Sequence, residues 1–99
     1  MVSGCNDEFR PTTTPAWAEF SWALGLQLRR ARDAKNLTQE AMAERAGISL
    51  YAYQQYERGA VTKNGAATNP RLATILAICQ ALDTPIEELL PPVPPLTTN

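Results

Sequence analysis

The residues best suited to contact a partner lie in one short stretch, GISLYAYQQYERG, at residues 47–59. Three tyrosines fall within six positions there, at Tyr51, Tyr53 and Tyr56. Aromatic surface of that size either fills a core or covers a contact with a large polar partner. Two neighbouring glutamines add amides that both donate and accept hydrogen bonds. The stretch therefore divides into residues for a core and residues for a partner, and the surrounding elements decide which are which.

The chemistry of enzymes and metal sites is poorly represented. The sequence has no histidine, which removes the commonest general base and the commonest metal ligand. Its two cysteines do not form a cluster, and Cys79 lies among aliphatic residues as a small buried hydrophobe would. No nucleophile–base pair and no phosphate-binding glycine loop is present. The sequence therefore predicts no enzyme, no metal site and no cofactor.

Length and composition indicate one small soluble domain. The 99 residues are 44% hydrophobic and 19% charged, and no apolar run approaches the roughly 18 residues needed to cross a bilayer. The N-terminal stretch lacks a basic segment followed by an apolar one, so we expect no signal peptide. Two unpaired thiols suit a reducing compartment. The expected location is the cytoplasm, in association with the nucleoid.

The net charge of −1 conceals a basic middle between acidic ends. Residues 29–71 hold eight of the nine Lys and Arg residues but four of the ten Asp and Glu residues. Such a block favours a polyanionic partner, although solvated faces of ordinary proteins produce it too.

Hydrophobic periodicity predicts an all-α chain of five helices. Apolar residues recur at spacings of three and four between residues 16 and 35, which is typical of an amphipathic helix. Thr38 and Ser49 are N-caps for two short helices that end near Gly47 and Gly59. Residues 60–69 are rich in turn formers and predict a loop.

The second half of the chain carries two further helix starts. Asn69 and Pro70 predict the start of a helix, because Pro is favoured at the first helical position. The residues expected on its buried stripe are Leu72, Ile75, Leu76, Cys79 and Leu82. Thr84 and Pro85 repeat the signal before the short helix IEELL. We expect residues 1–15 to form a flexible arm, residues 16–90 the domain, and residues 91–99 a Pro-rich tail.

The spacing from Gln39 onward is specific. Ala43 is the fifth residue, Gly47 the ninth, Ile48 the tenth, Tyr53 the fifteenth and Tyr56 the eighteenth, as two tightly crossing helices require. The chain here resembles the helix-turn-helix DNA-binding domains of the phage repressor and Cro type, the XRE family. The resemblance covers roughly residues 23–90 and rests on LGLQLRRARDAKNLTQEAMAERAGIS, YERG, NPRLATILAICQALD and PIEELL. It implies a compact five-helix bundle of the lambda-repressor-like type.

The resemblance also implies which residues meet double-stranded DNA. The family places the start of its third helix against base edges in the major groove. Carried over to this sequence, the base-contacting residues are Ser49, Leu50, Tyr51 and Gln55. The phosphate-contacting residues are Gln39, Gln54, Arg58, Lys63 and Arg71. Tyr53 and Tyr56 are expected to point into the core. Arg32 and Glu57 match a position pair that forms a structural ion pair in relatives.

Three functions remain open at this point. The first is a sequence-specific transcriptional regulator that binds a pseudo-palindromic operator as a homodimer, with the helix at 49–58 in the major groove. Its dimer surface is expected either around Ile78, Leu89 and Leu90 or at the Trp17 and Trp22 end of the first helix. The second is an antitoxin that binds a toxin and its own promoter. The third is a protein-interaction module that has lost DNA binding.

Overall fold

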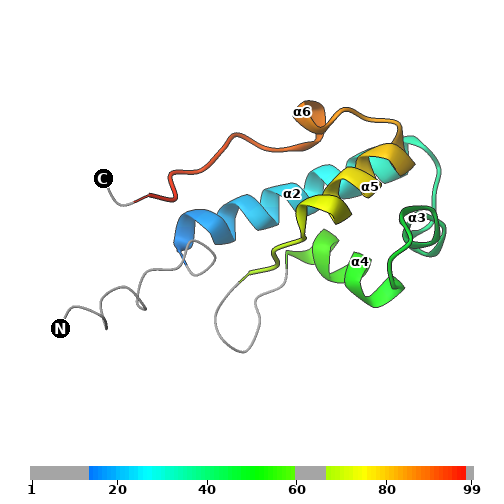
Figure 1. The fold of residues 1–99 in the computed structure, drawn as a ribbon, viewed down its shortest axis with the longest axis horizontal. Coiled ribbons are helices and arrows are strands. Elements are labelled where there is room, and N and C mark those ends of the chain that lie inside the picture. The colour runs from blue at the N-terminus through cyan, green and yellow to red at the C-terminus, as the bar shows by residue number, and fades with distance from the viewer. Residues whose placement is uncertain (1–13, 60–66, 98–99) are drawn as a thin grey trace.

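The computed structural model describes residues 14–59 and 67–97. These contain five α-helices (Figure 1): α2 (Pro15–Ala34), α3 (Gln39–Ala46), α4 (Leu50–Arg58), α5 (Leu72–Leu82) and α6 (Ile86–Leu89). The predicted all-α fold with five helices is confirmed. None of the described helices is long and apolar enough to cross a membrane.

The long helix α2 packs against α4 and, less extensively, against α6. It begins one residue earlier than predicted, because Pro15 occupies its first turn and the Thr14 hydroxyl accepts a hydrogen bond from the Trp17 amide at 3.1 Å. Helix α3 contacts both α4 and α5 at the far end of α2 (Figure 1). The predicted arm at residues 1–15 otherwise lies outside the described residues.

Helices α3 and α4 begin and end where the sequence predicts. The Thr38 and Ser49 hydroxyls cap them by accepting hydrogen bonds from backbone amides three residues ahead. Gly47 and Gly59 end them with φ values of 73° and 61°, in the left-handed region that glycine adopts without a steric penalty. These four residues fix the length of both helices and the tight turn between them.

One continuous core lies between α2 and the other helices. Its buried side chains come from every helix, and its centre includes Leu28, Met42, Tyr53, Ile78 and Leu82. Phe20, Ile48 and Tyr56 pack against it from the edge. Burial of these side chains is the main source of the domain's stability. It also holds the inner face of α4 firmly against α2.

The structure corrects the predicted start of α5. The helix begins at Leu72 with Arg71 as N-cap, and no side chain caps it, so neither Asn69 nor Pro70 starts the helix. The cause is tertiary: the Thr68 carbonyl accepts hydrogen bonds from Ser21 and Trp17 of α2, at 2.9 and 3.1 Å. Those bonds keep the chain non-helical up to residue 71. In the same way α6 begins after Pro85, without a side-chain cap from Thr84.

The buried stripe of α5 also differs from the predicted one. Ile75, Cys79 and Leu82 are buried as expected, but Leu72 and Leu76 are exposed and Ile78 is buried in their place. Ile78 and Leu89 lie fully in the core of the single chain. They therefore cannot form the exposed dimer surface that the sequence suggested.

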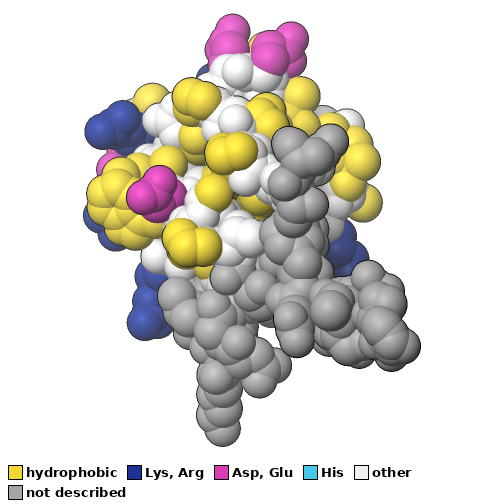
Figure 2. Space-filling model, turned by 90° about the vertical axis from the view of Figure 1, so that its left-hand side faces the viewer, with side chains coloured by type: hydrophobic (Ala, Val, Ile, Leu, Met, Phe, Trp, Pro, Cys, Tyr) yellow, Lys and Arg dark blue, Asp and Glu magenta, His cyan; other side chains and the backbone are white. Residues whose placement is uncertain are grey.

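The C-terminal segment returns along α2 (Figure 1). Four of its prolines, Pro91, Pro92, Pro94 and Pro95, border a groove whose other wall is Ala16, Glu19, Phe20 and Ala23 of α2. Figure 2 views the molecule from this end of α2, with the acidic side chains of α6 at the top and Lys and Arg side chains on the flanks.

Candidate nucleic-acid interface

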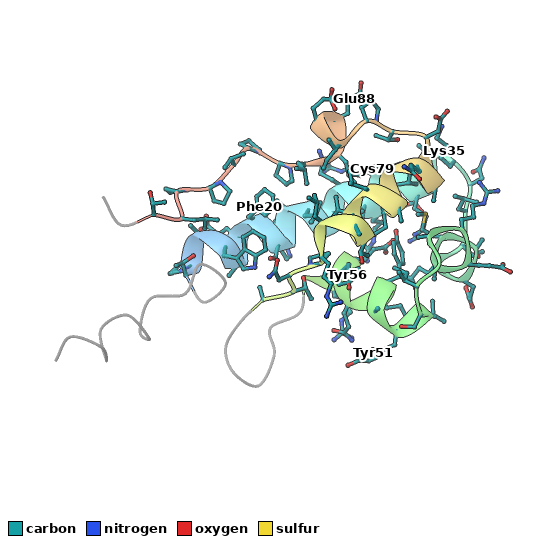
Figure 3. All side chains as sticks on the ribbon, in the orientation of Figure 1. Phe20, Lys35, Tyr51, Tyr56, Cys79 and Glu88 are labelled. Atoms are coloured by element: carbon teal, nitrogen blue, oxygen red, sulfur yellow. The ribbon has the colours of Figure 1, made fainter. Side chains whose placement is uncertain are left out.

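Helix α4 presents two different faces. Tyr53 is completely buried and Glu57 nearly so, and both point toward α2. Tyr51 stands on the opposite edge with 72% of its surface exposed, and Figure 3 shows it at the free side of the helix. Tyr56 lies between these extremes, half-buried against the core. The predicted inward direction of Tyr53 is therefore confirmed, and Tyr51 is available to a partner.

The four residues predicted to contact bases lie together at the start and outer side of α4. Ser49 and Tyr51 are exposed, while Leu50 and Gln55 are half-buried. The Ser49 oxygen accepts a hydrogen bond from the Ala52 amide at 3.0 Å, which leaves its own hydroxyl hydrogen free to donate. The side chain of Gln55 forms no hydrogen bond with a described residue. Its amide can therefore turn to suit a partner.

A buried ion pair ties α4 to α2. The Arg32 Nε donates to Glu57 Oε2 at 2.5 Å and its Nη2 donates to Oε1 at 3.2 Å, a two-pronged geometry. The third nitrogen of Arg32 donates to the Leu37 carbonyl at 2.9 Å. Only 13% of the Arg32 side chain and 1% of the Glu57 side chain are exposed. The pair that the sequence suggested is therefore present, and it joins α2, the turn before α3, and α4.

Electrostatics reinforce this clamp, the ion pair of Arg32 and Glu57 that holds α4 to α2. Burial alone would raise the pKa of Glu57, but the hydrogen bonds from Arg32 and Gln39 and the nearby Tyr53 hydroxyl outweigh it and leave that pKa below its ordinary value. The bond to Glu57 raises the pKa of Arg32 in turn. Burial raises the pKa of Tyr53, and the neighbouring Glu57 charge adds to the rise. The Tyr53 hydroxyl is close enough to Glu57 to influence it, yet it has no partner within full hydrogen-bond geometry. The carboxylate of Glu57 is therefore ionised at neutral pH, and Tyr53 keeps its proton.

The residues predicted to contact phosphates are divided among different environments. Gln39, the first residue of α3, donates from Nε2 to Glu57 Oε1 at 2.9 Å and accepts from Gln54 Nε2 at 3.3 Å. Both glutamines are half-buried, whereas Arg58 and Arg71 are exposed. Lys63 lies outside the described residues. The structure thus joins Gln39 and Gln54 in one network and leaves the two arginines at the surface.

Two glycines that sequence reasoning left without a site role set the approach of α4 to α2. A Cβ on Gly25 of α2 would collide with the Glu57 carbonyl oxygen. A Cβ on Gly59 would lie 2.9 Å from the Ser21 carbonyl oxygen and from the Trp22 Cα. A glycine inside a helical pattern costs roughly 1 kcal/mol relative to alanine, so Gly25 was itself a signal of close packing.

Among the described residues no cluster of His, Cys, Asp and Glu is placed to hold a metal ion.

Comparison with known proteins gives this arrangement a family. A protein-family model described as a helix-turn-helix domain matches residues 23–91. The restriction-modification controller protein C.AhdI from Aeromonas hydrophila is 32% identical, with a TM-score of 0.61, and the match covers 74% of this chain and 98% of that one. No curated protein sequence matches the chain significantly.

Two further solved structures share the fold. The hypothetical transcription factor NHTF from Neisseria is 25% identical with a TM-score of 0.61, and the match covers 75% of this chain and 76% of that one. An HTH_3 family transcriptional regulator from Vibrio cholerae is 24% identical with a TM-score of 0.60, over 73% of this chain and 36% of that one, which concerns the fold alone. With residues 23–91 matched and its helix-turn-helix motif built by α3 and α4, the chain belongs to the helix-turn-helix domain family, in the phage repressor and Cro (XRE) type.

Proposed function

We propose that the protein is a sequence-specific DNA-binding transcriptional regulator that reads a pseudo-palindromic operator as a homodimer. The observation that carries the proposal is the division of α4 into a clamped inner face and a free outer edge. Tyr53 and Glu57 fix the helix to α2, while Ser49, Tyr51 and the half-buried Leu50 and Gln55 remain accessible. A helix held in this way enters a major groove without losing its own orientation.

The accessible residues offer chemistry that fits base edges. Gln55 carries an amide that pairs with adenine N6 and N7, and Leu50 suits a thymine methyl group. Tyr51 adds an aromatic ring with a hydroxyl at its tip. Because this set is only modestly polar, DNA shape supplies part of the specificity.

Phosphate contacts would position α4 in the groove. Arg58 and Arg71 are exposed cations without an ion pair to any described residue, and Gln39 retains one amide hydrogen at the start of α3. Contacts of this kind fix the register of the protein on DNA and carry no sequence information themselves.

A homodimer follows from the size of the domain. One small module presents a limited interface to DNA, and pairing two modules on half-sites about 34 Å apart is the usual route to high affinity. With Ile78 and Leu89 in the core, the remaining candidate surfaces are the exposed Leu72 and Leu76 of α5 and the exposed Trp22 of α2.

The likeness to C.AhdI adds a candidate for what is regulated. That protein is a restriction-modification controller, and it matches this chain over 98% of its own length. Control of restriction-modification genes is therefore a candidate role here.

The proposal is tested by selecting bound sequences from a randomised duplex DNA library at about 100 mM salt, since phosphate contacts make binding strongly dependent on salt. We expect enrichment of a two-fold symmetric site. Gln55→Ala should abolish the preference at one position of each half-site. Arg71→Ala should weaken binding to all sequences alike and lower the salt slope by about one.

An absence of enrichment at every protein concentration would contradict DNA reading. Tyr51 would then be a candidate contact for a protein partner, such as a toxin.

A further inference from the structure

A chain of four hydrogen-bonded polar side chains runs from the interior to the half-buried side of α4 that meets α3. Arg32 of α2 binds Glu57, Glu57 accepts from Gln39 of α3 at 2.9 Å, and Gln39 accepts from Gln54 of α4 at 3.3 Å. Glu57 is buried, and the other three are half-buried. The chain thus links the clamp between α2 and α4 to a glutamine beside the predicted base-reading residues.

The charge at the buried end fixes the direction of every bond in this chain. Ionised Glu57 can only accept hydrogen bonds, so Gln39 must turn its amide nitrogen toward the carboxylate. The Gln39 oxygen then faces Gln54 and can only accept, so Gln54 must turn its own nitrogen inward. Reversal of the Gln39 amide would set two acceptors against each other, and reversal of the Gln54 amide would do the same.

Gln55, the next residue, has no such restraint. Its side chain forms no hydrogen bond with any residue that the structure describes. The two neighbouring glutamines therefore differ before any partner binds. The amide of Gln54 is held in one orientation, whereas the amide of Gln55 can adopt either of its two orientations.

We propose that Gln54 is a base-reading residue, oriented by Gln39 and Glu57, and that it recognises adenine. This inference rests on the proposed function. With its nitrogen directed to Gln39, Gln54 keeps its carbonyl oxygen and one amide hydrogen for a partner. Adenine presents a donor at N6 beside an acceptor at N7 in the major groove, which matches both groups.

The alternatives satisfy Gln54 less well. A phosphate offers acceptors only, so it would set its negative oxygens beside the Gln54 carbonyl oxygen. Guanine presents two acceptors on its major-groove edge, and cytosine a single donor. The phosphate role expected for Gln54 from the family resemblance is therefore replaced by base reading, and Gln39 becomes its positioning residue.

The test compares variants in the same library selection. For the wild-type protein we expect an adenine in each half-site that is preferred about five- to a hundredfold over the other bases, the range of a good two-pronged contact. Gln54→Ala should remove this preference and leave the other positions unchanged. Gln39→Ala should reduce it at the same position, whatever uniform loss of affinity accompanies that change. Gln55→Ala is the matched control and should act at a different position.

A second measurement needs no DNA. Hydrogen exchange of the side-chain amides in the free protein should be slower for Gln54 than for Gln55, and Gln39→Ala should remove the difference. Equal exchange rates for the side-chain amides of Gln54 and Gln55 would contradict the orientation of Gln54 by Gln39 and Glu57.

The selection has three outcomes that would overturn the inference. A uniform loss of affinity in Gln54→Ala, with all base preferences kept, would make Gln54 a phosphate contact. If Gln54→Ala loses the adenine preference but Gln39→Ala keeps it in full, Gln39 does not position Gln54. No enriched site for the wild-type protein would overturn the proposed function as well, and only that outcome does so.

Discussion

The two halves of the domain hold their shape by different means. Around α3 and α4, hydroxyl caps, left-handed glycines and a buried ion pair determine each helix end and crossing. Helices α5 and α6 have no side-chain caps, and α5 carries no charged residue. The ends of α3 and α4 are set by their own capping side chains and glycines, whereas the body of α5 is held by apolar burial.

The two kinds of contact have different roles: one sets the orientation of α4, and the other supplies stability. Hydrogen bonds and ion pairs have preferred directions, so they set the orientation of α4 to within narrow limits. Apolar packing is less directional and supplies most of the stabilising free energy. The helix proposed to read DNA therefore lies in the half where geometry is most tightly specified.

Removal of the ion pair between Arg32 and Glu57 should have the largest effect on the stability of the domain. Arg32→Ala leaves buried Glu57 with only the exposed Arg29, whose Nε lies 4.0 Å from Glu57 Oε1, and we expect the free energy of unfolding to fall by about 3–5 kcal/mol at pH 7. Urea unfolding measures the loss. Arg30→Ala, an exposed arginine two residues away, is the control and should change stability by less than about 0.5 kcal/mol.

The effect of Arg32→Ala should also depend on pH. The lowered pKa of Glu57 means that its stabilising contribution is complete above its ordinary value of 4.5 and is lost as the pH falls through the folded-state value. Without Arg32, burial raises the pKa of Glu57, so the deficit of the variant should shrink in acid. A deficit that stays constant from pH 7 to pH 3 would show that packing, and not charge, holds the helices together.

A pair of glycine variants gives the next largest effect. Gly59→Ala combines left-handed strain of about 1–2 kcal/mol with a collision against the α2 backbone, which adds about 1–3 kcal/mol. Gly47→Ala introduces the same kind of strain with no atom within 4 Å of the new methyl group. Thermal unfolding should therefore show a clearly lower Tm for Gly59→Ala than for Gly47→Ala. Equal losses would mean that α2 and α4 can separate freely at this point.

The smallest effect is expected on the exposed side of α5. Leu72 is 68% exposed, so Leu72→Gln should change the free energy of unfolding by no more than about 0.5 kcal/mol in dilute solution. Ile78→Ala, in the same helix but fully buried, should cost about 2–5 kcal/mol. A loss above 1 kcal/mol for Leu72→Gln that grows with protein concentration would instead place Leu72 in an interface between two copies.

The polar half of the fold could be predicted from the sequence because its signals are local. Thr38, Gly47, Ser49 and Gly59 act on the backbone within a few residues of themselves, and all four cap the helices as predicted. Tyr53 was placed in the core by its spacing from Gln39, and it is buried there. The assignments of individual residues to DNA remain predictions.

The apolar half was predicted less well because its signals are ambiguous or distant. Helix α5 is apolar at nearly every position, so its periodicity could not separate Ile78 from Leu72. The start of α5 depends on Thr68 contacting α2, some fifty residues away in the sequence. The bond between Gln39 and Gln54 depends on how α3 crosses α4, which no local pattern encodes.

The anchoring of the chain on both sides of residues 60–66 has a consequence for protein engineering. Gly59 lies against the backbone of Ser21 and Trp22, and the Thr68 carbonyl is bound by Ser21 and Trp17. The stretch of α2 from Trp17 to Trp22 therefore contacts both the end of α4 and the segment that leads into α5. An engineered change in this stretch of α2 would therefore act on the end of α4 and on the approach to α5 at once.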